Sequence, residues 1–426
     1  MAGIILFFLA LALLFVGFPV AYTFAGVSLA VGILVLGTDL FAFMPFRMMA
    51  IMENTIMMAI PMFIFMGVVL QKTGLAERLL ESMGKLFGGF SGGLAVSTII
   101  VGALLAASTG VVGASVVAMG VISLPVMLKR KYHIPTATGT ICAAGTLGQI
   151  IPPSIILIIL GDVMGIPVGD LFQAALVPGL FLVGVYVIYI LVVGQLKPDF
   201  CPPVIVDESR ARLLLQVSKD VLPTLALIVA VLGSIFTGIA TPTESAALGA
   251  VGALILAFAY GSLSLESVRS ASSETVKVTS MVFAVLVGAT AFSMVFSYSD
   301  SEYIVEQFIL GLPGERWTFI FLAMAIILIL GFFIDFIEIA FIVVPILVPI
   351  AELLGINMTW FAILIAMNLQ TSFLTPPFGF SLFYLKGVSP DGVRTTDIYR
   401  GVLPFIVLQV IVLATIIAFP QLLFVD

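Results

Sequence analysis

Residues 145–162 read GTLGQIIPPSIILIILGD, and residues 368–387 read NLQTSFLTPPFGFSLFYLKG. In each stretch an apolar run is interrupted by paired prolines, Pro152-Pro153 and Pro376-Pro377, at an offset of 376 − 152 = 224. A proline inside a helix removes one backbone N–H and clashes with the preceding turn. Both stretches are therefore predicted to be helices that are broken in the middle.

Two other pairs of prolines recur at nearly the same offset. Pro125 and Pro345 each close an apolar run, 345 − 125 = 220, and Pro19 and Pro242 each follow a glycine-containing break, 242 − 19 = 223. Three pairs of prolines at nearly the same offset indicate that one structural unit occurs twice in the chain. In an apolar chain, duplication together with broken helices is typical of a secondary transporter.

The composition places the chain in lipid. Hydrophobic residues make up 62% of the sequence, charged residues 9%, and the mean hydropathy is +1.29. Soluble domains contain about 45–50% apolar and about 25% charged residues. Backbone groups in lipid need internal partners, and continuous apolar runs without strand alternation favour helices over a barrel. We therefore expect an all-α protein surrounded by membrane lipid, with no nucleic-acid partner.

The chain is predicted to consist of two repeats joined by a linker. The predicted boundaries are 1–195 for the first repeat, 196–220 for a cytoplasmic linker and 221–426 for the second repeat. The broken helices are expected at 136–165 and 358–387. In the second repeat, a polar surface stretch at 264–279 is expected to precede a separate span at 280–297.

Each repeat is also predicted to contain a re-entrant helical hairpin, at 92–128 and 317–350. In the first, two apolar arms meet at Ser108, Thr109 and Gly110. Each arm is shorter than the about 20 residues that a membrane crossing needs. Small polar residues at the junction therefore indicate a tip that stops within the membrane.

Charged residues orient the two hairpins. The flanks of the first hairpin are basic, and those of the second are mostly acidic. Because positive residues stay in the cytoplasm, the first hairpin is expected to open to the cytoplasm and the second to the outside. Like units of opposite orientation form an inverted repeat. Its hairpin tips and broken helices would enclose one site that is reached alternately from each side.

The broken helices predict the chemistry of this site. Free helix N-termini suit a carboxylate, and free backbone carbonyls suit Na⁺. Oxygen ligands without thiolate or imidazole fit an alkali cation better than a transition metal. The candidate Na⁺ ligands are Ser108, Gly110, Ser115, Gly145, Thr146, Gly331, Asp335, Thr371 and Thr375.

These candidates have an ordinary alternative. Serine and threonine in membrane helices often donate to the carbonyl one turn earlier, and glycine often serves close helix packing. Acids within the membrane are stronger signals because burying them is costly. Asp335 is therefore expected to bind the coupling ion or the substrate. Glu338 either lies beside it or faces a loop, and Glu244 is expected to cap a helix that begins near Pro242.

Three segments carry a family resemblance. AASTGVVGASVVAMG, GTICAAGTLGQIIPPSIILIILGD and TGIATPTESAALGA, in this order, resemble the large membrane subunit, DctM type, of tripartite ATP-independent periplasmic (TRAP) transporters. The resemblance implies an elevator-type transporter of the bacterial inner membrane, with a rigid scaffold and a moving domain that contains both hairpins. It implies Na⁺ coupling and no other cofactor. The implied partners are a small four-helix membrane subunit and a soluble periplasmic substrate-binding protein.

By position in these motifs, Thr109, Ser154 and Asp335 match positions implicated in substrate and Na⁺ binding. We expect the Ser154 hydroxyl to face the cavity between the hairpin tips. One departure concerns the first tip, where many relatives have two serines and this chain has Val111 and Val112. The less polar tip favours a small organic acid over a sugar acid.

Two other functions compete with this interpretation. An organic-anion carrier of related inverted-repeat fold would work without a binding protein. A membrane-embedded enzyme would need a catalytic pair, such as two intramembrane aspartates or a serine with a histidine. Asp335 has no aspartate partner in another predicted span, and His133 lies in a basic loop, so the sequence disfavours an enzyme.

Overall fold

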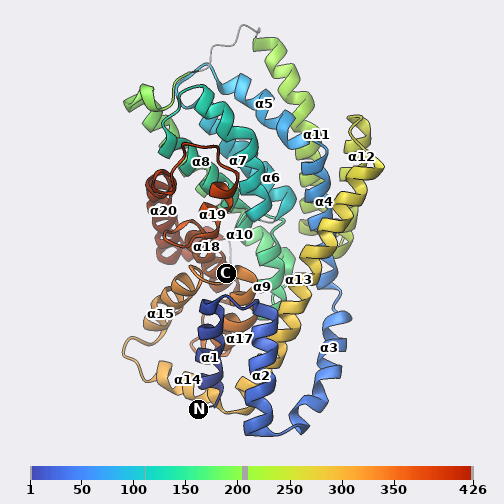
Figure 1. Ribbon diagram of the computed structural model, residues 1–426, viewed down its shortest axis with the longest axis vertical. Helices are drawn as coiled ribbons and strands as arrows, with labels where there is room; N and C mark the ends of the chain where they lie inside the picture. The colour runs from blue at the N-terminus through green and yellow to red at the C-terminus, as the bar shows by residue number, and fades with distance from the viewer. Residues whose placement is uncertain (1, 111, 204–209, 424–426) are drawn as a thin grey trace.

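The computed structural model describes residues 2–110, 112–203 and 210–423, and every regular element in these residues is a helix (Figure 1). Within the described part of the chain, seven helices are long and apolar enough to cross a membrane. An eighth span results if two helical stretches, Asp39–Met52 and Ile56–Lys72, are counted together across their bend of 57°. The prediction of an all-α multi-pass membrane protein is thus confirmed.

The first half of the chain runs to the end of α10, before the segment 204–209. Its helices are α1 (Ala2–Val16), α2 (Val20–Leu36), η1 (Asp39–Phe43), α3 (Met44–Met52), η2 (Ile56–Met58), α4 (Ala59–Lys72), α5 (Leu75–Phe87), α6 (Gly93–Thr109), α7 (Val112–Lys129), α8 (Ile134–Thr146), η3 (Leu147–Gln149), α9 (Ile155–Met164) and α10 (Val168–Leu196).

The second half begins at Arg210 and follows a similar order. Its helices are α11 (Arg210–Phe236), α12 (Pro242–Ala259), α13 (Leu265–Tyr298), α14 (Ser301–Leu310), α15 (Glu315–Leu330), α16 (Phe336–Glu338), η5 (Ile339–Val343), α17 (Val344–Leu353), α18 (Met358–Leu374), α19 (Phe380–Val388) and α20 (Thr395–Ala418).

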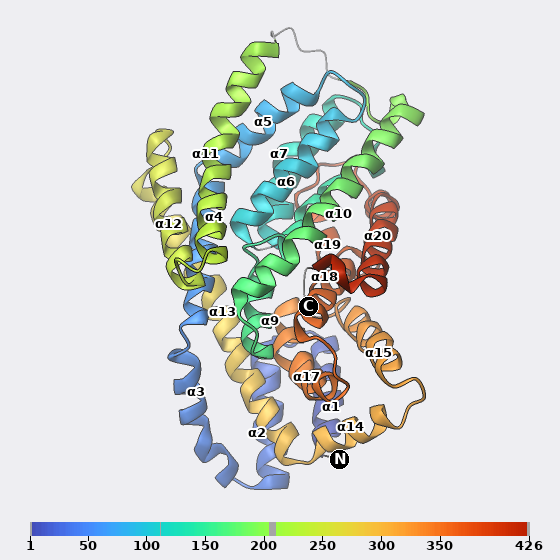
Figure 2. The same cartoon turned by 180° about the vertical axis from the view of Figure 1, so that it is seen from behind.

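The helices form two neighbouring groups. In both views α4, α11 and α12 lie on one side of the molecule, and α15, α18 and α20 lie on the other (Figures 1 and 2). The long helix α13 packs against α2 and α4, whereas α8 packs against α7 and α20. The pair α6 and α7 lies in the upper half of Figure 1, and α15 and α17 lie in the lower half. The cavity described below lies between the two groups.

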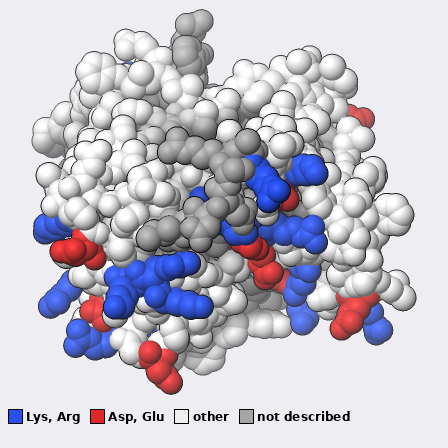
Figure 3. Space-filling model, turned by 90° about the horizontal axis from the view of Figure 1, so that it is seen from above, with Lys and Arg blue, Asp and Glu red and all other residues white. Residues whose placement is uncertain are grey.

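The upper end of the molecule carries clusters of lysine and arginine among a few acids (Figure 3). From the sequence, such a basic end is expected on the cytoplasmic side. Large apolar side chains are exposed along the helices, for example Leu34, Ile239 and Phe258, at 85%, 82% and 75%. Such side chains fit a surface that faces lipid.

Two expected boundaries differ from the structure. Residues 264–279 and 280–297 form one helix, α13, rather than a surface stretch and a separate span. Ser264 starts this helix by accepting a hydrogen bond from the Ser267 N–H, and no proline interrupts it afterwards. The helix α11 begins at Arg210, so the second part of the expected linker is already helical.

Candidate functional site

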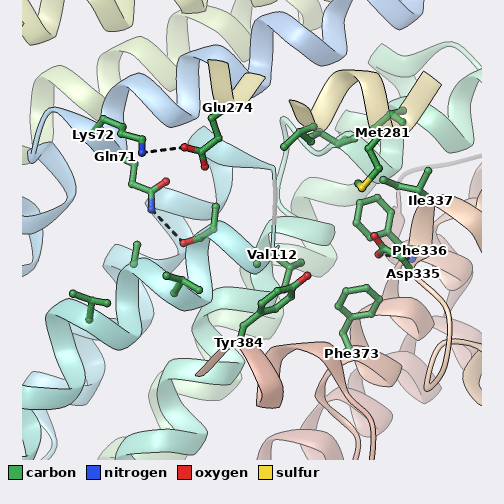
Figure 4. Close-up of a pocket in the computed structure, with 18 of the residues that line it drawn as sticks. Gln71, Lys72, Val112, Glu274, Met281, Asp335, Phe336, Ile337, Phe373 and Tyr384 are labelled. Atoms are coloured by element: carbon green, nitrogen blue, oxygen red, sulfur yellow. Dashed lines mark hydrogen bonds and ion pairs between the residues drawn. The ribbon is translucent and has the colours of Figure 1, made fainter. Parts of the chain in front are cut away.

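A cavity of about 620 Å³ lies between the two groups of helices (Figure 4). On one side, α4 contributes Gln71 and Lys72, and α13 contributes Glu274. The Lys72 ammonium lies 3.1 Å from the Glu274 carboxylate. The other side is formed by α7, the segment before and within α16, α18 and α19, with Val112, Asp335, Phe336, Phe373 and Tyr384 among its residues.

Gly110 ends α6 and lies against the first broken helix. Its backbone has a φ of +59°, and its N–H donates to Ala106 O at 3.0 Å. A Cβ built on Gly110 would lie 3.3 Å from the Ile155 nitrogen and 3.4 Å from the Pro153 oxygen. Both the left-handed backbone and the close approach therefore require glycine here. The end of α6 and the first proline break are in direct contact.

Ser154 begins α9 directly after the paired prolines. It is fully buried, and its hydroxyl donates to Gln149 O at 2.7 Å. Ser154 is not among the residues that line the cavity. In this structure the hydroxyl thus bonds within the proline break, and the role of Ser154 in substrate binding stays a prediction.

Two other predicted residues lie outside the described part of the site. The helix α6 extends through Ser108 and Thr109, but the side chains of these two residues are not among those that the structure describes. Val111 also lies outside the described residues. The expected cavity-facing hydroxyl of Thr109 and the expected cation ligand Ser108 thus remain predictions.

Asp335 and Glu338 lie side by side at the second hairpin. The Phe336 N–H donates to Asp335 Oδ1 at 2.7 Å, and the Asp335 N–H donates to Glu338 Oε2 at 2.7 Å. This reciprocal arrangement is a capping box, which explains how the chain turns into α16. Asp335 lines the cavity, and Glu338 is 8% exposed. Neither Asp335 nor Glu338 forms a salt bridge with a basic side chain among the described residues.

The remaining candidates in the first repeat lie on α7 and α8. Gly145 on α8 faces α7, since a Cβ built on it would lie 3.0 Å from the Val116 backbone nitrogen. The Thr146 hydroxyl donates to Ala143 O at 2.9 Å within its own helix. Ser115 on α7 is 1% exposed. Gly110 and Gly145 thus lie at close contacts between helices, and the role of these candidates in cation binding stays a prediction.

The candidates in the second repeat gather on α18. The Thr371 hydroxyl donates to Met367 O at 2.9 Å, and the Thr375 hydroxyl to Thr371 O at 2.7 Å. These bonds follow the ordinary pattern of hydroxyl groups in membrane helices. Gly331 at the end of α15 allows close contact with α18, because a Cβ there would lie 2.2 Å from Ser372 Oγ.

Three functional candidates were missed by the sequence interpretation. Gln149 and Gln370 are almost fully buried, and both polar atoms of each side-chain amide lack a partner among the described residues. Both lie within the quoted stretches, so a buried amide beside a proline break was an available signal. Tyr384 lines the cavity from α19, and the sequence offered no signal that distinguishes it from the other aromatic residues after the second break.

The sequence matches one transporter family over almost its whole length. The chain matches the family described as "Tripartite ATP-independent periplasmic transporter, DctM component" over residues 7–422. The chain belongs to this DctM family. It is therefore a transporter permease subunit and not an enzyme.

Individual members of the family are similar along most of their length. The sialic acid TRAP transporter large permease protein SiaM of Vibrio cholerae is 30% identical over 412 residues, which is 96% of this chain and 95% of SiaM. The C4-dicarboxylate TRAP transporter large permease protein DctM of Pseudomonas aeruginosa is 30% identical over 396 residues, 93% of this chain and 91% of that protein. Members with different named substrates are thus equally similar to this chain.

Two further comparisons concern the length and the fold. The isethionate TRAP transporter permease protein DctMQ of Oleidesulfovibrio alaskensis is 32% identical over 357 residues, 84% of this chain but 55% of DctMQ. The crystal structure of the Alcanivorax borkumensis YdaH transporter matches with a TM-score of 0.64 at 13% identity, covering 99% of both chains. This DctM-family chain therefore shares the YdaH fold.

Proposed function

We propose that this chain carries a small organic acid, as its carboxylate, together with Na⁺ across the bacterial inner membrane. It would do so as the transport subunit of a tripartite system. The observation that supports this most is the charge of the cavity. Its described lining contains the carboxylates Glu77, Glu274 and Asp335 but only one ammonium group, Lys72, so the balance is 1 − 3 = −2.

A carboxylate would enter such a cavity against repulsion. Two like charges 4 Å apart repel by about 4 kcal/mol at an effective dielectric constant near 20. Entry of an anion thus becomes favourable when cations accompany it. Because the cavity-lining Asp335 and the buried Glu338 have no basic partner among the described residues, this pair is the natural place for a cation.

The ligands available near the two breaks suit Na⁺. Carboxylate, amide and backbone carbonyl oxygens are hard ligands, which alkali cations prefer. The unpartnered amides of Gln149 and Gln370 add two such oxygens to the predicted set around Gly110 and Thr371. We propose one Na⁺ region at the first break and one at the second hairpin.

The partners are proposed from the family. The isethionate relative is named DctMQ, so its name combines the M of the large subunit with the Q of the small subunit in one permease protein. This chain spans 55% of that relative. We propose that a separate small membrane subunit supplies the remaining part. A periplasmic binding protein would deliver the substrate, as the resemblance to tripartite transporters implies.

Reconstitution of the whole system tests this function. The chain and its small subunit are placed in liposomes, the soluble protein is added outside, and uptake of labelled pyruvate, succinate and N-acetylneuraminate is measured. We expect uptake of at least one acid under an inward Na⁺ gradient and little uptake under an equal K⁺ gradient. Uptake driven equally by both gradients would contradict Na⁺ coupling.

The same assay separates the competing carrier. Omitting the soluble protein should abolish uptake in a tripartite system. If uptake continues at the same rate without that protein, the chain works as a binding-protein-independent symporter instead.

A further inference from the structure

Tyr384 on α19 lines the cavity between the first turn of α7 and the second hairpin. Its side chain is 41% exposed, and Figure 4 shows its hydroxyl pointing into the space between Val112 and Asp335. The ring lies against Gly113, since a Cβ built on that glycine would lie 3.0 Å from the ring atom Cζ. Contact with α7 therefore holds the ring and leaves the hydroxyl directed toward the cavity.

The charges of the cavity limit the charge of its ligand. Lys72 is the one basic side chain among the described residues that line the cavity, and Glu274 lies 3.1 Å from it. No free basic group therefore lies along the described walls, so each carboxylate of a ligand depends on neutral hydrogen-bond donors and on accompanying cations. Because an unpaired buried charge is costly, a ligand with one carboxylate fits better than a dicarboxylate.

The surroundings of Tyr384 limit the polarity of the ligand. Val112, Phe336 and Phe373 face the same space as the Tyr384 hydroxyl (Figure 4). Hydroxyl groups of a sugar acid would lose their hydrogen bonds to water at these walls without replacement. An apolar ligand body would instead gain from burial there.

We propose that Tyr384 is a substrate-recognition residue and that the substrate is a monocarboxylate with an apolar body. The Tyr384 hydroxyl donates a hydrogen bond to the carboxylate, and the apolar body packs against Val112 and Phe373. This inference rests on the proposed function, because it names the substrate class of the same cavity.

Thermal unfolding of the purified full chain in Na⁺-containing detergent buffer tests this inference. The midpoint is titrated with 4-methyl-2-oxopentanoate, succinate and N-acetylneuraminate. We expect a saturable rise with the first acid at concentrations at least ten-fold lower than with the other two. In Tyr384→Phe, which keeps the ring on Gly113, the apparent affinity for this acid should fall about ten-fold or more. A separate titration with Na⁺ alone should be unchanged.

Tyr303→Phe is the matched control, because Tyr303 lies on α14, 61% exposed, and is not among the residues that line the cavity. An unchanged titration in Tyr384→Phe would overturn the role of Tyr384. A stronger response to succinate or to N-acetylneuraminate would overturn the substrate class. If Na⁺ raises the midpoint but no acid does, the inference fails while Na⁺ binding stands. If neither Na⁺ nor any acid has an effect, the proposed function fails as well.

Discussion

Asp335 combines two tasks in one side chain. One carboxylate oxygen caps α16 through the Phe336 N–H, and the charge of the group remains without a basic partner among the described residues. The cap requires only an oxygen, which asparagine also supplies. The charge requires a carboxylate. The two tasks can therefore be separated by a single substitution.

We predict that Asp335→Asn keeps the fold and weakens Na⁺ coupling. Losing one charge interaction at an effective dielectric constant near 20 removes a few kcal/mol, which is on the order of 100-fold in affinity. Uptake measured against Na⁺ concentration should show this shift, whereas assembly with the small subunit should survive. Glu306→Gln on α14, which removes an acid away from the cavity, is the control. Unchanged Na⁺ dependence in Asp335→Asn would make Asp335 a structural residue only.

Gly110 allows a second prediction at this scale, because Gly165 provides a matched control. Both have a positive φ, +59° and +66°, so alanine costs roughly 1–2 kcal/mol at either position. Only Gly110 is in close contact, with Ile155 and Pro153, whereas nothing lies within 4 Å of a Cβ on Gly165. Thermal unfolding should therefore show a larger loss for Gly110→Ala than for Gly165→Ala. Equal losses would mean that α6 does not depend on this close contact.

The sequence predicted the types of residue at the site better than their orientations. Gly110 could be singled out because a glycine next to small polar residues favours a break in an apolar run, and Asp335 because an acid in such a run is rare and costly. The hydroxyls of Ser154 and Thr371 could not be oriented, since the nearest free carbonyl depends on how the chain turns locally. Both donate to backbone oxygens of their own segment.

At the scale of elements, the broken helices were the easiest to predict. The prolines interrupt the helices where the sequence places them, and Glu244 caps α12 in a reciprocal arrangement with Thr241, which confirms that expectation. The extent of α13 could not be predicted from polarity. Its polar first part and its apolar second part form one helix. The polarity of the side chains depends on what surrounds a helix, whereas the continuity of the helix depends on its backbone hydrogen bonds.

Proline substitutions test whether α13 is continuous. Val276 lies within the helix and is 62% exposed, so Val276→Pro should cost about 3 kcal/mol through the lost backbone hydrogen bond and the ring clash. Leu265→Pro is the control, because proline is tolerated at the first helical position. Thermal unfolding should show a clear loss for Val276→Pro and little change for Leu265→Pro. Similar midpoints for both variants would contradict one continuous helix.

At the scale of the whole molecule, composition and the recurring prolines predicted a helical membrane transporter. They could not predict which side chains meet in the cavity. Lys72, Glu274 and Tyr384 come from helices that are far apart in the sequence, and their meeting depends on how the two groups of helices pack. Local periodicity contains no information on that packing, which explains why the tyrosine was missed.

Hydrogen bonds join α4 and the segment before it to the helices α7 and α9 on the other side of the cavity. Asn54 Nδ2 donates to Asp162 Oδ1 at 2.6 Å, which connects the segment before α4 to α9, and Gln71 Nε2 donates to Ala114 O at 3.4 Å, which connects α4 to α7. If the groups slide past each other during transport, as the family resemblance implies, both contacts must break in every cycle. A covalent bond across one of them would prevent that movement.

We therefore predict that crosslinking Asn54→Cys to Asp162→Cys with a short thiol-specific reagent stops transport. Each single variant treated in the same way should keep the transport rate that it has before treatment, because it forms no bridge. The native Cys142 and Cys201 are buried, so the treated parent protein controls for side reactions. Uptake in liposomes before treatment, after treatment and after cleavage of a reducible crosslinker is the measurement. If the bridged protein transports at the rate of the untreated double variant, α9 and the segment before α4 stay together throughout the cycle.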